Sequence, residues 1–298
     1  MTGILLIALA GTLWSLDTLV RYPLVGKGVN PVLIVFYEHV ILCLLFFLPY
    51  AFSLFKRLKD ITLKDAFSFF VIGGLGSAIA TVAFTEAFVS INPTLVILLQ
   101  KFQPVVAITL ATVVLKEKID RNFLLLAGIS LLGAFLISFP DLKELFNVNF
   151  DLSEASKLRA YLLVLLSVLI WGSATVFGKR LSMKGYDTKE IMAGRYILGF
   201  FFLLPFIQFQ KEAFLLPDST DYLKVIVMVI VSGALGMWVY YKGMLQLSAK
   251  NTAVAEMFFP LVAVIVNWIF LDQALNVIQI LGGLLLIFGS YTIHMKKY

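Results

Sequence analysis

The sequence predicts an all-α integral membrane protein with ten transmembrane helices arranged as two inverted five-helix repeats. Of its 298 residues, 60% are hydrophobic and 14% are charged, whereas about 25% of the residues of a soluble domain are charged. Ten apolar stretches are each long enough to cross a bilayer, which takes about 20 residues. Residues of the first half also recur in the second half at the same spacing. The first two observations predict the membrane helices, and the third predicts the repeat.

The ten apolar stretches follow one another with mostly short connections. Their predicted bounds are roughly 3–21, 31–53, 66–89, 93–115, 122–139, 158–179, 190–209, 222–247, 251–271 and 276–295. The first is full length and begins without a basic segment, so we interpret it as a retained helix rather than a signal peptide. The fifth and tenth are apolar almost throughout, unlike the alternating strands of a membrane barrel. Cys43, the only cysteine, lies in the second stretch, so the chain forms no intrachain disulfide.

Six positions of the first half reappear in the second half at matching spacing. They are Trp14, Gly28, Glu38, Pro104, Leu115 and Gly133, which correspond to Trp171, Gly185, Arg195, Pro260, Leu271 and Gly289. We therefore predict a first repeat at 1–139, an external linker at 140–157 and a second repeat at 158–298. Because each repeat holds five helices, an odd number, the two have opposite orientations in the bilayer, as in many alternating-access transporters.

Basic residues are distributed unevenly between the two predicted faces of the membrane. Of the 24 Lys and Arg residues, fourteen lie on the face that carries the termini, seven lie on the opposite face, Arg21 among them, and three lie within helices. The positive-inside rule then predicts a multi-pass protein of the inner (cell) membrane with both termini in the cytoplasm. The same bias accounts for most of the net charge of +6, so this charge gives no reason to expect a nucleic-acid partner.

Several ionisable residues fall inside the predicted helices. A charged side chain near the bilayer centre costs at least about 2.5 to 3.5 kcal/mol, so each needs a partner or a water-filled cavity. The candidates for carrying a coupling proton are Asp17, Glu38, His39, Glu86 and Glu256. In one interpretation, Lys101 only neutralises Glu38 or Glu86. Arg195 would likewise neutralise Glu256, and the pairs would fix helix register. Buried ion pairs are weak sources of stability, so we favour a polar pathway between the repeats.

Two prolines lie at corresponding positions of the fourth and ninth predicted helices. Pro104 leaves the carbonyl of Gln100 without its helical hydrogen bond, and Pro260 does the same for Glu256. We predict a kink at each proline with a polar side chain facing a cavity, where transporters commonly bind substrates and ions. The alternative is that the kinks only accommodate neighbouring helices.

Aromatic and polar side chains near these positions complete a predicted substrate site. Trp14 and Trp171 lie near mid-helix, away from the interfaces where tryptophan is enriched, and their rings suit an amphipathic solute or a cation. The predicted substrate-binding residues are Trp14, Tyr37, Gln100, Lys101, Gln103, Trp171, Arg195, Trp238, Tyr241 and Glu256. The two histidines lie too far apart to share a metal, and no HExxH, GxSxG or phosphate-loop motif is present. We therefore expect no catalytic residues, no metal site and no cofactor.

These features together resemble the EamA-type members of the drug/metabolite transporter superfamily. The resemblance rests on a mid-helix tryptophan opening each half, an arginine in the second helix, a proline-kinked fourth helix and an acidic residue closing it. Here these are Trp14 and Trp171, Arg195, Pro104 and Pro260, and Glu117. The pattern departs at Glu38, where the first repeat lacks the arginine, and at Gln273, where the second lacks the acid. The resemblance covers nearly the whole chain and implies a metabolite carrier, often an amino acid exporter, with a central cavity.

We expect a transporter rather than an enzyme: a secondary-active carrier that exports a small polar or amphipathic metabolite, an amino acid or related solute, by alternating access. Protons are the candidate coupling ion, because burial favours the neutral form of a carboxyl group. Lys101 or Arg195 would bind a substrate carboxylate. The alternatives are an uncoupled facilitator or exchanger, and an intramembrane lipid-modifying enzyme with Glu38 and His39 as acid and base. The sequence leaves open whether the protein is a monomer or a homodimer in its lipid bilayer.

Overall fold

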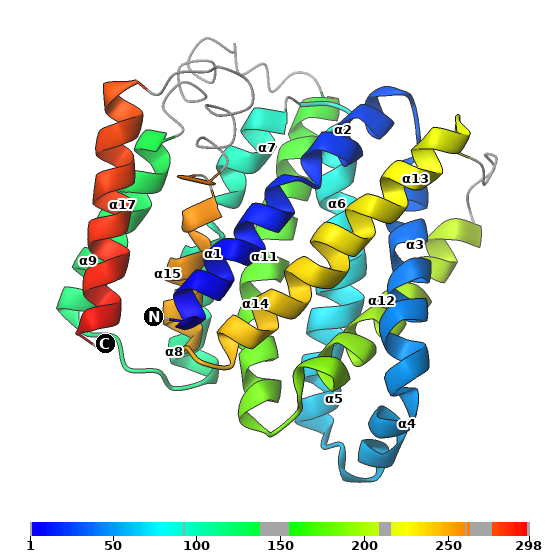
Figure 1. Cartoon of the computed structure of the whole chain (residues 1–298), viewed down its shortest axis with the longest axis horizontal. Coiled ribbons are helices and arrows are strands. Elements are labelled where there is room, and N and C mark those ends of the chain that lie inside the picture. The colour runs from blue at the N-terminus through cyan, green and yellow to red at the C-terminus, as the bar shows by residue number, and fades with distance from the viewer. Residues whose placement is uncertain are drawn as a thin grey trace.

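The computed structural model describes residues 2–91, 93–137, 155–208, 216–259, 261–262 and 276–296. Within these residues the chain is all-helical (Figure 1). Seven helical segments in this part are long and apolar enough to cross a membrane: Thr2–Gly26, Pro31–Arg57, Leu63–Ala87, Ala155–Met183, Thr188–Gln208, Ser219–Met244 and Val277–Met295. These seven coincide with predicted segments, and the count of ten stays a prediction.

The first half of the chain consists mainly of interrupted helices. Its helices are α1 (Thr2–Ser15), α2 (Thr18–Gly26), α3 (Pro31–Leu42), α4 (Leu48–Arg57), α5 (Leu63–Phe69), α6 (Ala80–Ala87), α7 (Pro93–Gln100), α8 (Gln103–Val114) and α9 (Arg121–Ile137). The first membrane segment breaks at Leu16–Asp17 and continues to Gly26, five residues beyond the predicted end. Arg21, the last residue of the predicted segment, therefore lies inside α2 rather than at a helix end, and it is 3% exposed.

The second half begins with two long uninterrupted helices. Its helices are α11 (Ala155–Met183), α12 (Thr188–Gln208), α13 (Ser219–Met228), α14 (Met237–Met244), α15 (Ala249–Glu256) and α17 (Val277–Met295). Three wider π-helical segments, Cys43–Phe47, Phe70–Ile79 and Val229–Gly236, join α3 to α4, α5 to α6 and α13 to α14. The second and third are rich in glycine, which allows close packing. A Cβ atom on Gly73 would lie 2.7 Å from the backbone oxygen of Arg195 on α12, so this glycine permits the two helices to touch.

A break rather than a kink interrupts the fourth predicted helix. Helix α7 ends at Gln100, Lys101 and Phe102 form a turn, and α8 begins at Gln103. Pro104 sits in the first turn of α8, where its missing N–H costs no helical hydrogen bond. Helix α15 likewise ends at Glu256, with a turn at Met257. The predicted kink at Pro260 lies outside the described residues.

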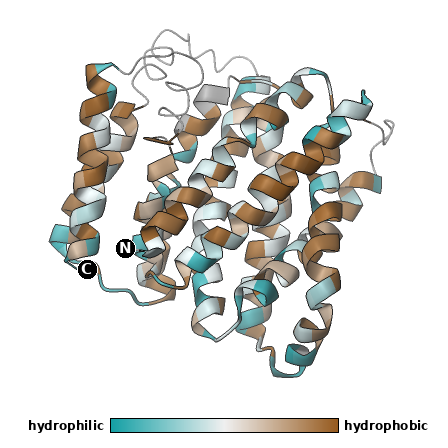
Figure 2. Cartoon of the chain, in the orientation of Figure 1, coloured by the Kyte–Doolittle hydropathy of each residue, from teal (hydrophilic) through white to brown (hydrophobic). Residues whose placement is uncertain are grey.

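Helices of the two halves interleave. Helix α11 packs against α6, α8 and the segment Phe70–Ile79, α1 packs against α14 and α15, and α9 packs along α17. Figure 2 shows brown, apolar residues along the middle of many helices and teal, hydrophilic residues at many turns. Large apolar side chains stay exposed on outer faces, such as Phe52 (71%) and Leu284 (60%). Exposed apolar surface on such a scale fits a protein surrounded by lipid.

Charged residues tie the helix ends together at both ends of the bundle. At the turn between α11 and α12, Arg57 Nε donates to Glu190 Oε1 (3.2 Å). At the opposite end, Lys27 Nζ donates to Asp221 (2.8 and 2.9 Å) and to Asp218 (3.2 Å). The hydrogen bonds to Asp221 and Asp218 hold the pKa of the Lys27 ammonium group above its ordinary value. These contacts connect α2 to α13 and α4 to α12.

Candidate functional site

A cavity of about 230 Å³ lies between the two halves of the chain. It is lined by residues of α1, α2, α3 and α6 to α8 from the first half and of α11, α12, α14 and α15 from the second. Seven of the ten predicted substrate-binding residues line it: Trp14, Gln100, Lys101, Gln103, Trp171, Arg195 and Glu256. Three of the five proton-coupling candidates also do: Asp17, Glu38 and Glu256. The structure therefore brings most of the predicted residues to one place.

Two aromatic pairs form walls of the cavity. The ring centroids of Trp14 and Tyr240 lie 5.1 Å apart, and those of Trp171 and Phe84 lie 5.0 Å apart. Trp171 Nε1 donates a hydrogen bond to the backbone oxygen of Gly76 (2.9 Å), in the π-helical segment Phe70–Ile79. Its ring is therefore held in place by a polar contact as well as by packing. Each wall combines a ring from one half of the chain with a ring from the other.

Arg21 lies at the centre of a compensated charge cluster. Its Nε and Nη2 donate to the two carboxylate oxygens of Asp17 (2.6 and 2.9 Å), and Nη2 also donates to Glu38 Oε2 (2.9 Å). Its Nη1 donates to Thr85 Oγ1 (3.2 Å). The break between α1 and α2 places Asp17 where it can also accept from Ser232 (3.2 Å). We name Asp17, Arg21 and Glu38 the outer triad; its two carboxylates exceed its single cation by one charge.

Sequence reasoning missed Arg21, and with it the partner of Glu38. In one interpretation of the sequence, Lys101 neutralises Glu38 or Glu86. In the structure Glu38 pairs with Arg21 and Glu86 pairs with Arg159 (3.1 Å) instead. A signal was present, because Asp17 and Arg21 are four residues apart and so share one face of a helix. The misplaced end of the first helix hid this spacing.

Glu256, the last residue of α15, accepts hydrogen bonds from neutral groups of three other helices. Tyr240 Oη of α14 donates to Oε1 (2.7 Å), Thr175 Oγ1 of α11 lies 3.1 Å from the same oxygen, and Gln103 Nε2 of α8 donates to Oε2 (2.7 Å). The described part of the chain gives Glu256 no Lys or Arg within 4 Å. The considered ion pair between Arg195 and Glu256 is therefore wrong.

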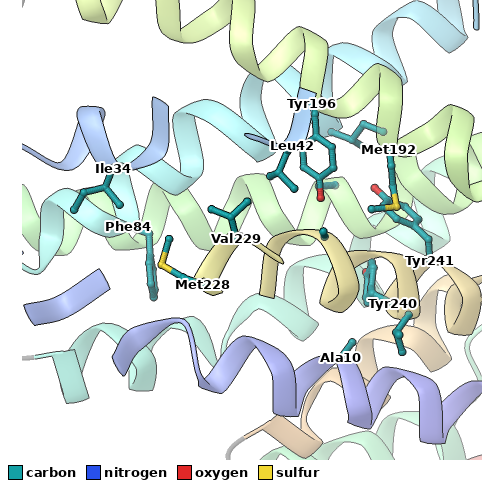
Figure 3. Packing of buried hydrophobic residues seen from close by; sticks show 14 of the residues in the cluster. Ala10, Ile34, Leu42, Phe84, Met192, Tyr196, Met228, Val229, Tyr240 and Tyr241 are labelled. Atoms are coloured by element: carbon teal, nitrogen blue, oxygen red, sulfur yellow. The ribbon is translucent and has the colours of Figure 1, made fainter. Parts of the chain in front are cut away.

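Arg195 of α12 is a buried cation with few partners. The residue is 9% exposed, and its Nη1 donates to Tyr241 Oη (3.2 Å). Its Nε is buried and has no hydrogen-bond partner among the described residues. Among the described residues it makes no ion pair within 4 Å. Figure 3 shows Tyr196, Tyr240 and Tyr241 gathered in this region, and Tyr196 Oη donates to the backbone oxygen of Gly233 (2.7 Å).

Five predicted residues do not line the cavity. Tyr37 packs edge-on against Tyr222, with ring centroids 5.7 Å apart. Trp238 is 39% exposed, with Lys242 over its ring. Tyr241 is buried behind two lining residues, since its hydroxyl accepts from Arg195 (3.2 Å) and its ring lies 5.5 Å from that of Tyr240.

The other two are His39 and Glu86. His39 is held between the backbone oxygen of Val35 (2.8 Å) and Ser77 Oγ (2.9 Å), and Glu86 pairs with Arg159 near the helix end. Glu38 and His39, the acid and base of the enzyme alternative, therefore have different hydrogen-bond partners. In the part of the chain that the structure describes, no group of three His, Cys, Asp or Glu residues is arranged to hold a metal ion.

Comparison with known proteins identifies the family. The sequence profile of the EamA-like transporter family matches residues 1–139 and 158–295. The chain belongs to this family. It is 29% identical over 290 residues to a protein named "Riboflavin transporter ImpX" from Fusobacterium nucleatum, covering 96% of this chain and 95% of that protein. The family resemblance inferred from the sequence is thus confirmed. As a member of this family, the chain is a membrane transporter.

Two further comparisons agree with this assignment. An "Uncharacterized transporter YoaV" from Bacillus subtilis is 29% identical over 163 residues, which covers 53% of each chain. A solved crystal structure superposes with a TM-score of 0.70 at 16% sequence identity, covering 99% of this chain and 98% of that one. At that identity the likeness concerns the fold alone. The fold of this EamA-family chain therefore matches that of the solved chain over nearly the full length of both.

Proposed function

We propose that this EamA-family transporter works by alternating access, with ten membrane helices in two inverted five-helix repeats. Several paired features support the repeat. Gly28 and Gly185 both have positive φ (82° and 86°) after corresponding helices. The segments Phe70–Ile79 and Val229–Gly236 each contain a glycine beside a tryptophan of the other half. Trp171 Nε1 donates to the backbone oxygen of Gly76, and a Cβ atom on Gly236 would lie 3.0 Å from Trp14 Nε1. Rocking of such halves about a central site is the usual transport mechanism.

The substrate we propose is a flat, heteroaromatic metabolite, with riboflavin as the first compound to test. The observation that carries this proposal is the cavity itself, whose aromatic walls are the pairs Trp14–Tyr240 and Trp171–Phe84. Aromatic walls bind flat rings by stacking and edge contacts. The relative named as a riboflavin transporter, which aligns over 96% of this chain, supports the same substrate.

An amino acid or related solute, moved outward, is the second candidate. Arg195 favours it, because a buried guanidinium with an unused Nε can bind a carboxylate. Glu256 on the same cavity can accept from an ammonium group. The aromatic walls then favour an aromatic amino acid.

We propose proton coupling at Glu256 rather than at the other candidates. Asp17 and Glu38 share the charge of Arg21, and Glu86 pairs with Arg159 outside the cavity. Glu256 lines the cavity, and its hydrogen-bond donors among the described residues are neutral. A proton and a substrate donor would compete for its carboxylate. Uncoupled exchange is the alternative, and transport that is independent of pH would favour it.

We further propose that the protein is not an enzyme and that it lies in the inner (cell) membrane with both termini in the cytoplasm. The transporter names of the relatives support the first point, and the excess of Lys and Arg in the loops on the face of the termini supports the second. An intramembrane lipid enzyme is disfavoured, because Glu38 is bound by Arg21 and His39 by Ser77.

Transport by purified protein tests these proposals. The protein is reconstituted into liposomes, and uptake of radiolabelled riboflavin is followed with and without a pH gradient, with protein-free liposomes as the control. We expect saturable uptake that unlabelled riboflavin suppresses. Uptake equal to that of protein-free liposomes would reject riboflavin. Saturable uptake of labelled tryptophan in its place would favour the amino acid candidate.

A further inference from the structure

Arg195 and Glu256 both line the cavity, and neither makes an ion pair within 4 Å in the part of the chain that the structure describes. We infer that they select the substrate by its charge: the cavity accepts a solute with no net charge that presents a hydrogen-bond acceptor to Arg195 and a donor to Glu256. This inference rests on the proposed transport function and adds the charge class of its substrate.

Arg195 supplies the donor side of this recognition. Its guanidinium carries five N–H groups, yet its hydrogen bond within the protein is the one from Nη1 to Tyr241 Oη. Nε is buried without a partner, and the residue lines the cavity. A buried cation with no carboxylate within 4 Å among the described residues is costly. An acceptor group of the substrate would relieve this cost.

Glu256 supplies the acceptor side. Tyr240 and Gln103 direct polar hydrogens at its two oxygens, and Thr175 lies within reach of one of them. An ionised carboxylate accepts about four hydrogen bonds, so Glu256 keeps room for a donor of the substrate.

The other charged residues of the lining are already engaged. Arg21 binds both Asp17 and Glu38, and Lys101 has an interaction of its own. The charged residues of the lining are three carboxylates and three cations, Asp17, Glu38, Glu256, Arg21, Lys101 and Arg195. Their formal charges balance, and such a site favours a solute with no net charge over an anionic or a cationic one.

Two neighbouring tyrosines each form a hydrogen bond with one of these two charged residues, Arg195 and Glu256. Tyr240 donates to Glu256 and Tyr241 accepts from Arg195. Both belong to α14, with ring centroids 5.5 Å apart at 70°. Because Arg195 and Glu256 line one cavity, a single solute can contact both. Riboflavin fits this pattern, since its ring carbonyls are acceptors, its side-chain hydroxyls are donors and its net charge is zero. Its phosphate ester, FMN, has the same ring and a negative charge.

Binding to the purified full-length protein in detergent tests the inference with two matched sets of probes. The first set is riboflavin and FMN. The second is tryptophan, which is a zwitterion, with indole-3-acetate as its anionic and tryptamine as its cationic counterpart. We expect the uncharged or zwitterionic member of the bound set to bind at least about tenfold more tightly than its charged counterparts, because placing like charges together is costly. These comparisons need no variant protein.

Two substitutions then identify the residues responsible. Arg195→Gln should weaken riboflavin binding by about tenfold to a hundredfold, the loss expected for a hydrogen bond to a charged group. Glu256→Gln should shift the ratio of FMN to riboflavin affinity by about tenfold toward FMN, since it removes the repelling carboxylate. The matched controls are Arg159→Gln and Asp60→Asn, which remove the same charges from exposed positions outside the cavity. We expect both controls to bind like the unaltered protein.

The outcomes separate this inference from the proposed function. FMN binding as tightly as riboflavin, indole-3-acetate binding as tightly as tryptophan, or an unchanged ratio in Glu256→Gln would overturn the charge selection. Failure of riboflavin with preferential binding of tryptophan over its charged counterparts would reject the flavin substrate and support the charge selection. Absence of binding throughout both sets would contradict both.

Discussion

Two arginines are buried inside this protein, and their surroundings differ. Arg21 is 3% exposed and has carboxylates of Asp17 and Glu38 within 2.9 Å. Arg195 is 9% exposed and has one tyrosine hydroxyl at 3.2 Å. Removing a charge from water is costly unless another charge compensates it. The protein compensates Arg21 itself, which marks the outer triad as structural. Among the described residues Arg195 has no such ion pair within 4 Å, which leaves it available to the substrate that we propose.

The largest expected effect comes from breaking the compensated side of this comparison. Arg21→Gln removes the partner of two partly buried carboxylates, and we expect a loss of stability of about 3 kcal/mol, the lower end of the range for breaking a buried pair. Denaturation of the variant in detergent, compared with Asp17→Asn plus Arg21→Gln, measures it. The double variant should recover part of the loss, since it leaves one uncompensated carboxylate instead of two. An Arg21→Gln protein as stable as the original would show that the triad has no structural role.

A smaller effect is expected from helix packing away from the charges. A Cβ atom on Gly133 of α9 would lie 2.6 Å from backbone atoms of Gly282 and Leu286 on α17. Gly133→Ala should therefore cost about 1–3 kcal/mol through overpacking. Gly128→Ala is the matched control, because a Cβ atom at Gly128 of the same helix meets no atom within 4 Å. The control should be neutral or slightly stabilising. Equal thermal shifts for both variants would contradict the packing of α9 on α17.

The next effect concerns the helix that carries Glu256. Glu117, between α8 and α9, accepts from the backbone N–H groups of Ala249 (2.7 Å) and Lys250 (3.0 Å) at the start of α15. It therefore acts as an N-terminal cap supplied from a distant part of the chain. Glu117→Gln should destabilise the protein by about 1 kcal/mol, because the amide keeps one acceptor oxygen and loses the charge. Thermal unfolding beside Asp60→Asn measures the loss, and no difference between the two would reject the cap.

The sequence predicted the helical membrane class and the family because both depend on patterns spread over the whole chain. Segment lengths and apolar content predicted the membrane segments, and spaced residues such as Trp14 and Trp171 predicted the family. Charged residues inside apolar stretches predicted that Arg195 and Glu256 belong to one site, since such residues need a polar cavity. The cavity contains both.

The errors have a common physical origin. Successive helix residues point about 100° apart, and no sequence pattern showed that Tyr240 lines the cavity while Trp238 is exposed. Helix ends are equally hard to locate: Arg21 follows a break at Leu16–Asp17 that no local pattern announced. Pairing between distant residues, such as Arg21 with Glu38, depends on three-dimensional packing and could not be predicted from spacing.

Substitution of Arg195 is expected to change stability least and to change binding strongly. The most direct test measures the unfolding temperature and the riboflavin affinity of Arg195→Gln together. The account predicts an unfolding temperature equal to or above that of the unaltered protein, because an uncompensated buried charge is removed, and riboflavin binding weakened at least about tenfold. A variant that unfolds at a much lower temperature and binds riboflavin normally would contradict it.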